Sequence, residues 1–362
     1  MKSYNHLWEK FIDEDNIKLA IKNSSNGGKK KKREDVSWVL NHEEWTIRRI
    51  KNNISHYKNS EHAPKIIYDG VSRKKRTIIV PTYQEQIVHH MLVNTLKFIF
   101  LKGTYEQAYG SIPGRGVHNG KKVIEKWIRS DAKNCKYCLK LDIKKYFENI
   151  NHDVLKEKSR KIIRDEKFLK VLFEVIDVTE KGLPLGFYTS QWLSMWFLKD
   201  FDHHVKEKCY APHYMRYMDD IVIFGANKRK LWKTYYEIVR YLSEELGGLK
   251  LNGKRQRFRF VYEKQDKEYG RDLDFMGFRF FRNRTILRKS IMFKMTRKAR
   301  KIGKKEKPTI FELRQMMSYM GWIKSCDIYN AFAKYVKPYF SFRKARKRVG
   351  KYDKRMVKLC GN

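Results

Sequence analysis

The sequence predicts an α+β fold, in which helices are combined with antiparallel strand pairs. Helical spacing of apolar residues is clearest at residues 84–100 and 230–246, and the second segment stops at two glycines. β-branched or apolar runs joined by polar turns predict strand pairs at residues 65–81, 213–225 and 273–281. The chain is therefore expected to bury antiparallel strands under helices.

Apolar spacing and turn residues also predict the elements in the remaining segments. Residues 4–21 have roughly helical apolar spacing, and an apolar strand at 138–143 ends near a carboxylate. A glycine-rich stretch at 108–120 leads into a helix at 121–128, and its glycines would let backbone N–H groups approach phosphates. Further helices are expected at 156–175, at 190–206 and from residue 282 onward.

Charge is the strongest global signal. The 362 residues include 81 Lys and Arg against 40 Asp and Glu, a formal net charge of +41. Such a chain repels itself unless a polyanion neutralises it, which predicts a nucleic-acid partner and salt-sensitive binding. An anionic membrane surface is the alternative, but the basic residues are spread along the chain rather than gathered on one amphipathic helix.

Several features predict a cytoplasmic protein. No run approaches the roughly 18 apolar residues of a membrane span, and the first nine residues lack an apolar signal core. Five cysteines are too few, and odd in number, for a disulfide framework. Cys135 and Cys138 form a C-x-x-C that could be half a zinc site or a redox pair, but no second pair accompanies it. Reduced, unligated cysteines are expected.

Two basic segments could each be either a solvated surface or a nucleic-acid contact. Residues 24–35 have no periodicity and include five consecutive basic residues, which suits either a solvated loop or a flexible nucleic-acid contact. Residues 282–305 hold eleven Lys and Arg and no acid. They form either a solvated face or a surface that contacts a duplex backbone.

Three carboxylates carry the chemical prediction. Asp142 ends the strand at 138–143, and Asp219 and Asp220 occupy the expected two-residue tip of the strand pair at 213–225. A polar turn is the ordinary explanation, but Asp-Asp suits a tight turn poorly and clustered like charges require a cation. Mg²⁺ accepts carboxylate and phosphate oxygens, and two such ions about 3.5–4 Å apart support in-line phosphoryl transfer. Two Mg²⁺ ions are therefore the predicted cofactor.

The motifs around these carboxylates resemble those of reverse transcriptases. Tyr217-Met218-Asp219-Asp220 is similar to the family signature, and residues 139–147 (LKLDIKKYF) resemble its first acidic motif. The resemblance implies a right-hand polymerase with fingers, a palm bearing an antiparallel sheet, and a helical thumb. It implies metal ligands at Asp142, Asp219 and Asp220, and it places Ile143 among the metal- and nucleotide-binding positions.

Further blocks follow in the family order between about residues 50 and 340. Arg76 in RTIIVP resembles the fingers arginine that contacts the incoming triphosphate, and Lys254 resembles a lysine that assists pyrophosphate departure. Template and primer positions are implied for Arg115 in the glycine-rich loop and for Tyr217 and Met218 of the signature. The same role is implied for the primer-grip residues Phe275, Met276 and Gly277.

One aromatic residue bears on sugar selection. Phe147 matches a family position where a ring packs at the place of a ribose 2′-hydroxyl. A bulky apolar ring cannot satisfy a buried hydroxyl, so the resemblance implies a DNA product and argues against an RNA product. The alternative is an ordinary core phenylalanine.

One block departs from most of the family. Residues 182–191 (GLPLGFYTSQ) carry Leu185, Gly186 and Gln191 at nucleotide-binding positions, in a pattern similar to the reverse transcriptases of diversity-generating retroelements. Those enzymes copy a template-repeat RNA with errors at adenine, so hypermutation is implied. Leu185 cannot hydrogen-bond beside the templating pair, so discrimination there would rest on shape. The implied partners are an RNA template, a DNA primer and product, dNTPs, a structured non-coding RNA and a small basic ring-forming accessory protein.

The expected domains are an N-terminal helical extension with the basic loop (1–60), fingers (61–137), palm with primer grip (138–281, with inserted finger helices near 156–180) and basic thumb (282–362). Two alternative functions remain open. A defence-associated reverse transcriptase making DNA against phage would share these motifs. A catalytically silent RNA-binding scaffold would keep the fold without the chemistry.

Overall fold

The computed structural model describes residues 3–27, 30–68, 75–253 and 255–360, with side chains described as far as residue 356. The chain forms two compact units. The first holds the described residues of 1–69, 74–116 and 139–257, and the second those of 117–138 and 258–362. No helix in the described part of the chain is both long and apolar enough to cross a membrane.

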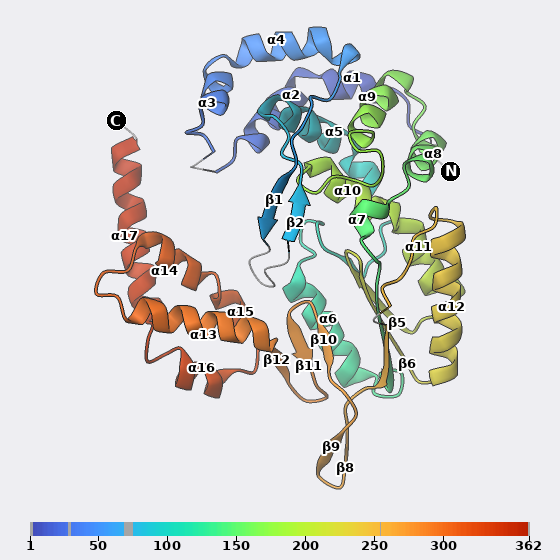
Figure 1. Ribbon diagram of the computed structural model, residues 1–362, viewed down its shortest axis with the longest axis vertical. Helices are drawn as coiled ribbons and strands as arrows, with labels where there is room; N and C mark the ends of the chain where they lie inside the picture. The colour runs from blue at the N-terminus through green and yellow to red at the C-terminus, as the bar shows by residue number, and fades with distance from the viewer. Residues whose placement is uncertain (1–2, 28–29, 69–74, 254, 361–362) are drawn as a thin grey trace. The chain divides into compact units, whose positions relative to one another are not determined.

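Helices form one half of the first unit (Figure 1). The buried helix α5 begins at a capping box, in which the Thr82 hydroxyl accepts from the Glu85 N–H and the Glu85 carboxylate accepts from the Thr82 N–H. It packs against α1, α2 and α10, so its apolar residues form a core. The helices are α1 (Leu7–Ile12), α2 (Glu14–Ser24), α3 (Glu34–Asn41), α4 (Glu43–Asn53), α5 (Tyr83–Leu101), α7 (Tyr146–Asn149), α8 (His152–Ile162), α9 (Glu166–Ile176), α10 (Tyr188–Phe197), α11 (Lys199–His203) and α12 (Lys228–Glu244).

A five-stranded sheet in the described chain carries the candidate site, in the order β3-β5-β6-β4-β7. These strands are β3 (Ala108–Tyr109), β4 (Tyr137–Asp142), β5 (His213–Tyr217), β6 (Asp220–Gly225) and β7 (Gln256–Arg259). β5 pairs antiparallel with β6 and parallel with β3. The apolar side chains of β6 are fully buried, and α12 packs against this strand (Figure 1). A separate antiparallel pair, β1 (Lys65–Tyr68) and β2 (Lys75–Ile78), carries Arg76.

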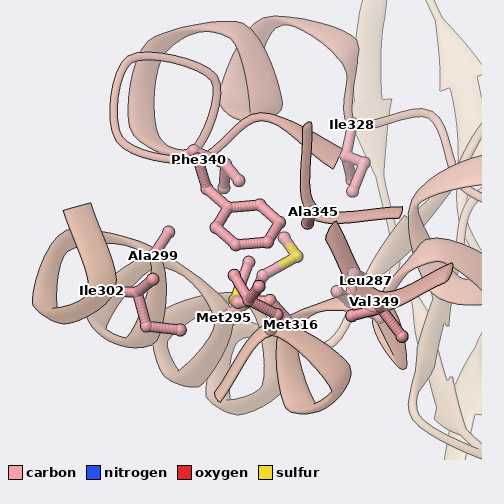
Figure 2. Close-up of a cluster of buried hydrophobic side chains, with 11 residues drawn as sticks. Leu287, Met295, Ala299, Ile302, Met316, Ile328, Phe340, Ala345 and Val349 are labelled. Carbon is pink, nitrogen blue, oxygen red and sulfur yellow. The ribbon is translucent and has the colours of Figure 1, made fainter. Parts of the chain in front are cut away.

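The second unit joins a small sheet to a helical subdomain. Antiparallel strands β10 (Leu273–Phe275), β11 (Phe278–Phe280) and β12 (Thr285–Leu287) form the sheet, and β8 (Tyr262–Lys264) pairs with β9 (Lys267–Tyr269). The helices are α6 (Val117–Ser130), α13 (Lys289–Gly303), α14 (Ile310–Met317), α15 (Met320–Lys324), α16 (Tyr329–Tyr335) and α17 (Phe342–Cys360). Figure 2 shows the core to which β12, α13, α14 and α17 contribute, in which Met295, Met316 and Phe340 converge.

The α+β prediction is confirmed, and the helices expected at 84–100 and 230–246 are present as α5 and α12. The helix expected at 156–175 is divided into α8 and α9, and that at 190–206 into α10, α11 and a π-helical turn. The segment from residue 282 is not helical at its start, because residues 285–287, which include the β-branched Thr285 and Ile286, pair with β11. The turn expected at Asp69-Gly70 lies outside the described residues.

Candidate active site

The acidic turn joins β5 to β6. Tyr217 pairs with Asp220, so the two-residue turn consists of Met218 and Asp219. The expected Asp-Asp tip is therefore shifted by one residue, because Asp220 already belongs to β6. Met218 has a positive φ of 55°, a conformation that costs a non-glycine residue about 1–3 kcal/mol.

Main-chain contacts hold Met218 in this conformation. Its N–H donates to the Tyr109 carbonyl of β3 at 3.0 Å, and its carbonyl accepts from Arg216 Nη1 at 2.9 Å. Its side chain lies against Gly110, where an added Cβ would stand 2.7 Å from Met218 Cγ. β3 therefore supports the turn from one side, and Gly110 provides space that no other residue type would leave.

A buried ion pair lies behind the turn. Arg216 is 1% exposed and Asp202 of α11 is 0% exposed. Arg216 donates from Nε and Nη2 to the two Asp202 oxygens at 2.6 and 2.5 Å, and the Tyr214 hydroxyl donates to Oδ1 at 2.6 Å. Bidentate geometry and a third donor satisfy the carboxylate, as a buried charge requires. Arg216 thus connects the Asp202 carboxylate to the Met218 carbonyl.

The strand β4 brings the third carboxylate to the same place. Asp142 is its last residue, and the next residue, Ile143, donates its N–H to the Asp219 carbonyl at 3.2 Å. Asn252 fixes Asp142 from the other side, since its Nδ2 donates to Asp142 Oδ2 at 3.1 Å. The Ile143 side chain is buried, so only its backbone could contribute to a metal or nucleotide.

Burial and the neighbouring charges both act on the pKa of Asp219. Burial raises the pKa of Asp219 to about 6, and the neighbouring Asp220 and Asp142 carboxylates add to the rise. Arg76 of β2 acts in the opposite direction and lowers that pKa. The predicted triphosphate-binding arginine and the three predicted metal ligands therefore share one electrostatic environment.

The donor chemistry fits magnesium. In the described residues, no three His, Cys, Asp or Glu side chains stand close enough together to hold an ion unaided. Mg²⁺ is commonly held by one or two carboxylates together with substrate phosphates and water, rather than by an all-protein cage. Asp142, Asp219 and Asp220 supply carboxylates of that kind. Burial is the main cause of the raised pKa of Asp219, the neighbouring carboxylates add to it, and a bound cation would favour the charged form.

The Leu185-Gly186 segment lies beside the end of β2. The Ile79 N–H donates to the Leu185 carbonyl at 2.8 Å, and a Cβ on Gly186 would stand 2.1 Å from the Ile79 carbonyl oxygen. Gly186 also has a φ of 116°, so both the close approach of Ile79 and the backbone conformation require glycine at this position. This packing brings the predicted nucleotide-binding block next to the strand that bears Arg76. Gln191 is exposed on α10.

Phe147 differs from its neighbour in burial. Tyr146 is fully buried and donates its hydroxyl hydrogen to the Ser194 carbonyl, whereas Phe147 is only half-buried. The Phe147 carbonyl accepts from the Leu183 N–H at 2.7 Å and lies against Gly182. A ring that keeps contact with solvent can face a ligand, so the geometry permits the sugar-selecting role.

Two further groups of predicted residues belong to the glycine-rich loop and to the second unit. Arg115 uses Nη1 to donate to the Tyr105 carbonyl at 2.7 Å, which stabilises its own loop. Phe275, Met276 and Gly277 belong to the second unit, where Phe275 is buried and the other two form a turn with φ of 51° and 86°. Lys254 lies outside the described residues.

Sequence reasoning missed the residues that support the acidic turn, namely Asp202, Arg216, Asn252 and Gly110. One signal was available, because Arg216 interrupts the apolar run of β5 and a cation inside a buried strand requires a carboxylate partner. Nothing in the sequence identified Asp202 as that partner.

Comparison with known proteins identifies the family. The model of the reverse transcriptase (RNA-dependent DNA polymerase) family matches residues 58–280, more than half of the chain. The chain therefore belongs to the reverse transcriptase family, and the expected right-hand polymerase fold is confirmed.

The curated relatives are distant. The retron Ec73 reverse transcriptase of Escherichia coli is 24% identical over 203 residues, which cover 51% of this chain and 61% of that protein. Protein YkfC of Escherichia coli (strain K12) is 24% identical over 146 residues, covering 37% and 38%. Nuclear intron maturase 1, mitochondrial, of Arabidopsis thaliana is 24% identical over 117 residues, covering 31% and 16%. The chain thus spans less than two thirds of each of these relatives.

Solved structures of telomerases are similar at low identity. The apo telomerase of Candida tropicalis gives a TM-score of 0.48 at 14% identity and covers 77% of this chain and 56% of that chain. The telomerase of Candida albicans, in complex with a TWJ fragment of telomeric RNA, gives 0.47 at 13% identity and covers 83% and 59%.

Proposed function

We propose that this chain is an RNA-directed DNA polymerase that uses two Mg²⁺ ions at Asp142, Asp219 and Asp220. The observation that carries the proposal is the convergence of the carboxylates, because Asp142 ends β4 and the next residue, Ile143, donates its N–H to the Asp219 carbonyl. Family membership supports the same reaction. Bound there, the ions would supply the charge neutralisation that phosphoryl transfer from a dNTP to a primer 3′-hydroxyl requires.

Each side chain has a defined task in this proposal. Arg76 binds the triphosphate, because a guanidinium presents a planar fork of N–H donors to phosphate oxygens. Phe147 excludes a ribose 2′-hydroxyl, and Leu185 and Gly186 border the nascent base pair with Gln191 nearby on α10. Lys254 assists pyrophosphate departure.

The template and primer tasks complete the assignment. Arg115 lies on the template side, Tyr217 and Met218 lie at the primer terminus, and Phe275, Met276 and Gly277 form the primer grip. The domain limits expected from the sequence, with fingers, palm and thumb at 61–137, 138–281 and 282–362, belong to the same proposal.

The finer proposal concerns fidelity. Leu185 is half-buried, and its apolar side chain offers no hydrogen bond to a templating base. This supports error-prone copying of a template-repeat RNA, as in diversity-generating retroelements, with a structured RNA and a basic accessory ring protein as partners. A defence-associated reverse transcriptase is the second candidate, because it would carry the same motifs and the same three carboxylates.

Primer extension tests both the proposed polymerase reaction and the assignment of its metal ligands. The purified protein is given an RNA template, a DNA primer, dNTPs and Mg²⁺, beside an Asp219→Ala, Asp220→Ala variant. Synthesis that disappears in the variant supports the polymerase and its metal site. Synthesis that the variant retains contradicts the metal assignment, and no synthesis by either, even with neighbouring RNA and accessory protein added, favours a silent scaffold.

Sequencing the product separates the two biological roles. Errors concentrated opposite template adenines support the retroelement role, and a Leu185→Gln variant is expected to reduce them while Asp142 and its neighbours are untouched. Faithful synthesis by the unaltered protein would move the assignment to the defence role. A Phe147→Val variant is expected to admit ribonucleotides, and unchanged sugar selectivity would refute that residue's assignment.

A further inference from the structure

We propose that the first half of α12, together with Arg255 and Arg257, binds single-stranded RNA at a site apart from the acidic turn. β6 begins at Asp220 and ends at Gly225, after which the chain enters α12 at Lys228. Five residue steps of a strand span about 17 Å, so α12 starts at the end of β6 that points away from the carboxylates. We call this surface the α12 basic face.

Unpaired positive charge is its first feature. Lys228, Arg229, Lys230 and Lys233 are all exposed, and within the described residues no carboxylate lies in ion-pair range of any of them. The second half of the same helix differs, because Arg240 is paired with Glu237 and Glu244 at 2.6 and 3.0 Å. Charge on α12 is thus segregated into a neutralised half and a half that would attract a polyanion.

Aromatic rings lie among these cations. Trp232 stacks on Tyr235 with centroids 4.9 Å apart and planes at 12°, and it meets Tyr236 edge to face at 5.1 Å. Tyr235 is nearly buried, whereas Tyr236 is 57% exposed. An exposed ring fixed by two neighbouring rings provides a platform on which a base can stack.

Two arginines are fixed over the same rings. Arg257 lies 4.3 Å from the Trp232 ring centre and Arg255 lies 5.3 Å from it. Arg255 Nη1 also donates to the Tyr235 hydroxyl at 3.0 Å. A guanidinium held over a ring still has N–H groups that can bind phosphate, and less rotamer freedom is lost on binding. The α12 basic face therefore combines preorganised phosphate donors with a stacking surface.

This combination fits an unpaired strand. A duplex hides its base faces and would use only the cations, whereas a single strand can use both the cations and Tyr236. An acidic protein would match the cations but has less use for a stacking ring. The choice of RNA over DNA rests on the proposed function, in which the product DNA is paired and the uncopied template is the strand left single.

The test is binding of a fluorescent, unstructured 12-nucleotide RNA by the whole protein, measured by anisotropy over a range of salt, without dNTPs. Lys230→Gln, Lys233→Gln should remove two phosphate contacts and lower the slope of log affinity against log salt by about 1.4. Tyr236→Ala should weaken binding roughly 5- to 100-fold with little change in slope. Arg240→Gln is the matched control on the same helix and should bind as the unaltered protein does.

A second measurement locates the contact among many other basic residues. RNA carrying 4-thiouridine should cross-link to the peptide that contains Tyr236. The four substituted side chains are exposed, so thermal melting should confirm that each variant is folded. Equal slopes and affinities in all variants would overturn the proposal, as would equal competition by duplex RNA. Competition by polyglutamate with the same dependence on Tyr236 would assign the face to an acidic protein instead. Because no synthesis is measured, inactivity as a polymerase would leave this result intact.

Discussion

Asparagine in place of Asp202 should destabilise the protein, although the side chain keeps its shape. Asp202 is the only carboxylate that meets Arg216 in the described structure, and both side chains are at least 99% buried. The substitution leaves a buried guanidinium without its counter-charge and sets an amide N–H₂ group against N–H donors. Breaking a buried pair in this way costs about 3–5 kcal/mol.

Two further variants separate the contributions to the stability loss that is expected for Asp202→Asn. Tyr214→Phe removes one hydrogen bond to a charged acceptor and should cost about 1.5–3 kcal/mol. Asp202→Leu, Arg216→Met removes both charges and should cost less than Asp202→Asn, because apolar residues of similar volume can replace a buried pair with little loss. The double variant should nevertheless lose the proposed polymerase activity, since Met218 no longer receives its hydrogen bond from Arg216.

Urea unfolding followed by circular dichroism gives the free energies, and primer extension gives the activity. A cost below about 1 kcal/mol for Asp202→Asn would refute the inference that the pair holds the turn. Full activity in the double variant would refute the positioning role of Arg216 while leaving its contribution to stability intact.

Three other substitutions test separate parts of the molecule. Since the pKa of Asp219 is raised to about 6 from 3.8, the folded metal-free protein binds a proton more readily than the unfolded chain, so stability should fall as pH rises from about 4 to 6. Urea midpoints for Asp219→Asn across that range should lack this contribution, and a parallel dependence in variant and parent would contradict the raised pKa. Burial lowers the pKa of His89 to about 3, and neither ring nitrogen has a hydrogen-bond partner among the described residues. His89→Leu should therefore stabilise the protein by about 1–2 kcal/mol in urea unfolding, and a loss would indicate that the ring is satisfied. Met316 is fully buried in the helical core of the second unit, so Met316→Ala should cost about 2–5 kcal/mol by thermal unfolding, and a smaller loss would mean that the core collapses around the cavity.

Local patterns were sufficient for much of the fold. The helix α5 was predictable because its apolar spacing and its Thr82 cap are both encoded within a few residues. The strand β6 was predictable because an uninterrupted apolar run of that length must be buried. The strand β12 was missed because its flanking arginines favoured a basic helix, whereas the β-branched residues Thr285 and Ile286 prefer a strand.

The candidate site also has a part that local sequence patterns predict and a part that they do not. Asp142, Asp219 and Asp220 were predictable from short motifs, since each carboxylate follows or precedes an apolar strand. The contacts that fix them were not, because Asp202 meets Arg216 across a helix and a strand, and Asn252 meets Asp142 at a separation of 110 residues. Pairings between distant segments depend on the final packing, which periodicity does not encode.

The acidic turn brings together features that oppose folding. Met218 is held at positive φ where glycine or asparagine would cost less, and partial burial together with the neighbouring carboxylates raises the pKa of Asp219. Both persist because Tyr109 and Arg216 bind the turn from either side. An Asn-Gly turn would connect β5 and β6 with less strain, so folding alone does not account for these residues. Strain that the surrounding structure maintains at a carboxylate cluster is most simply explained by the chemistry of the carboxylates.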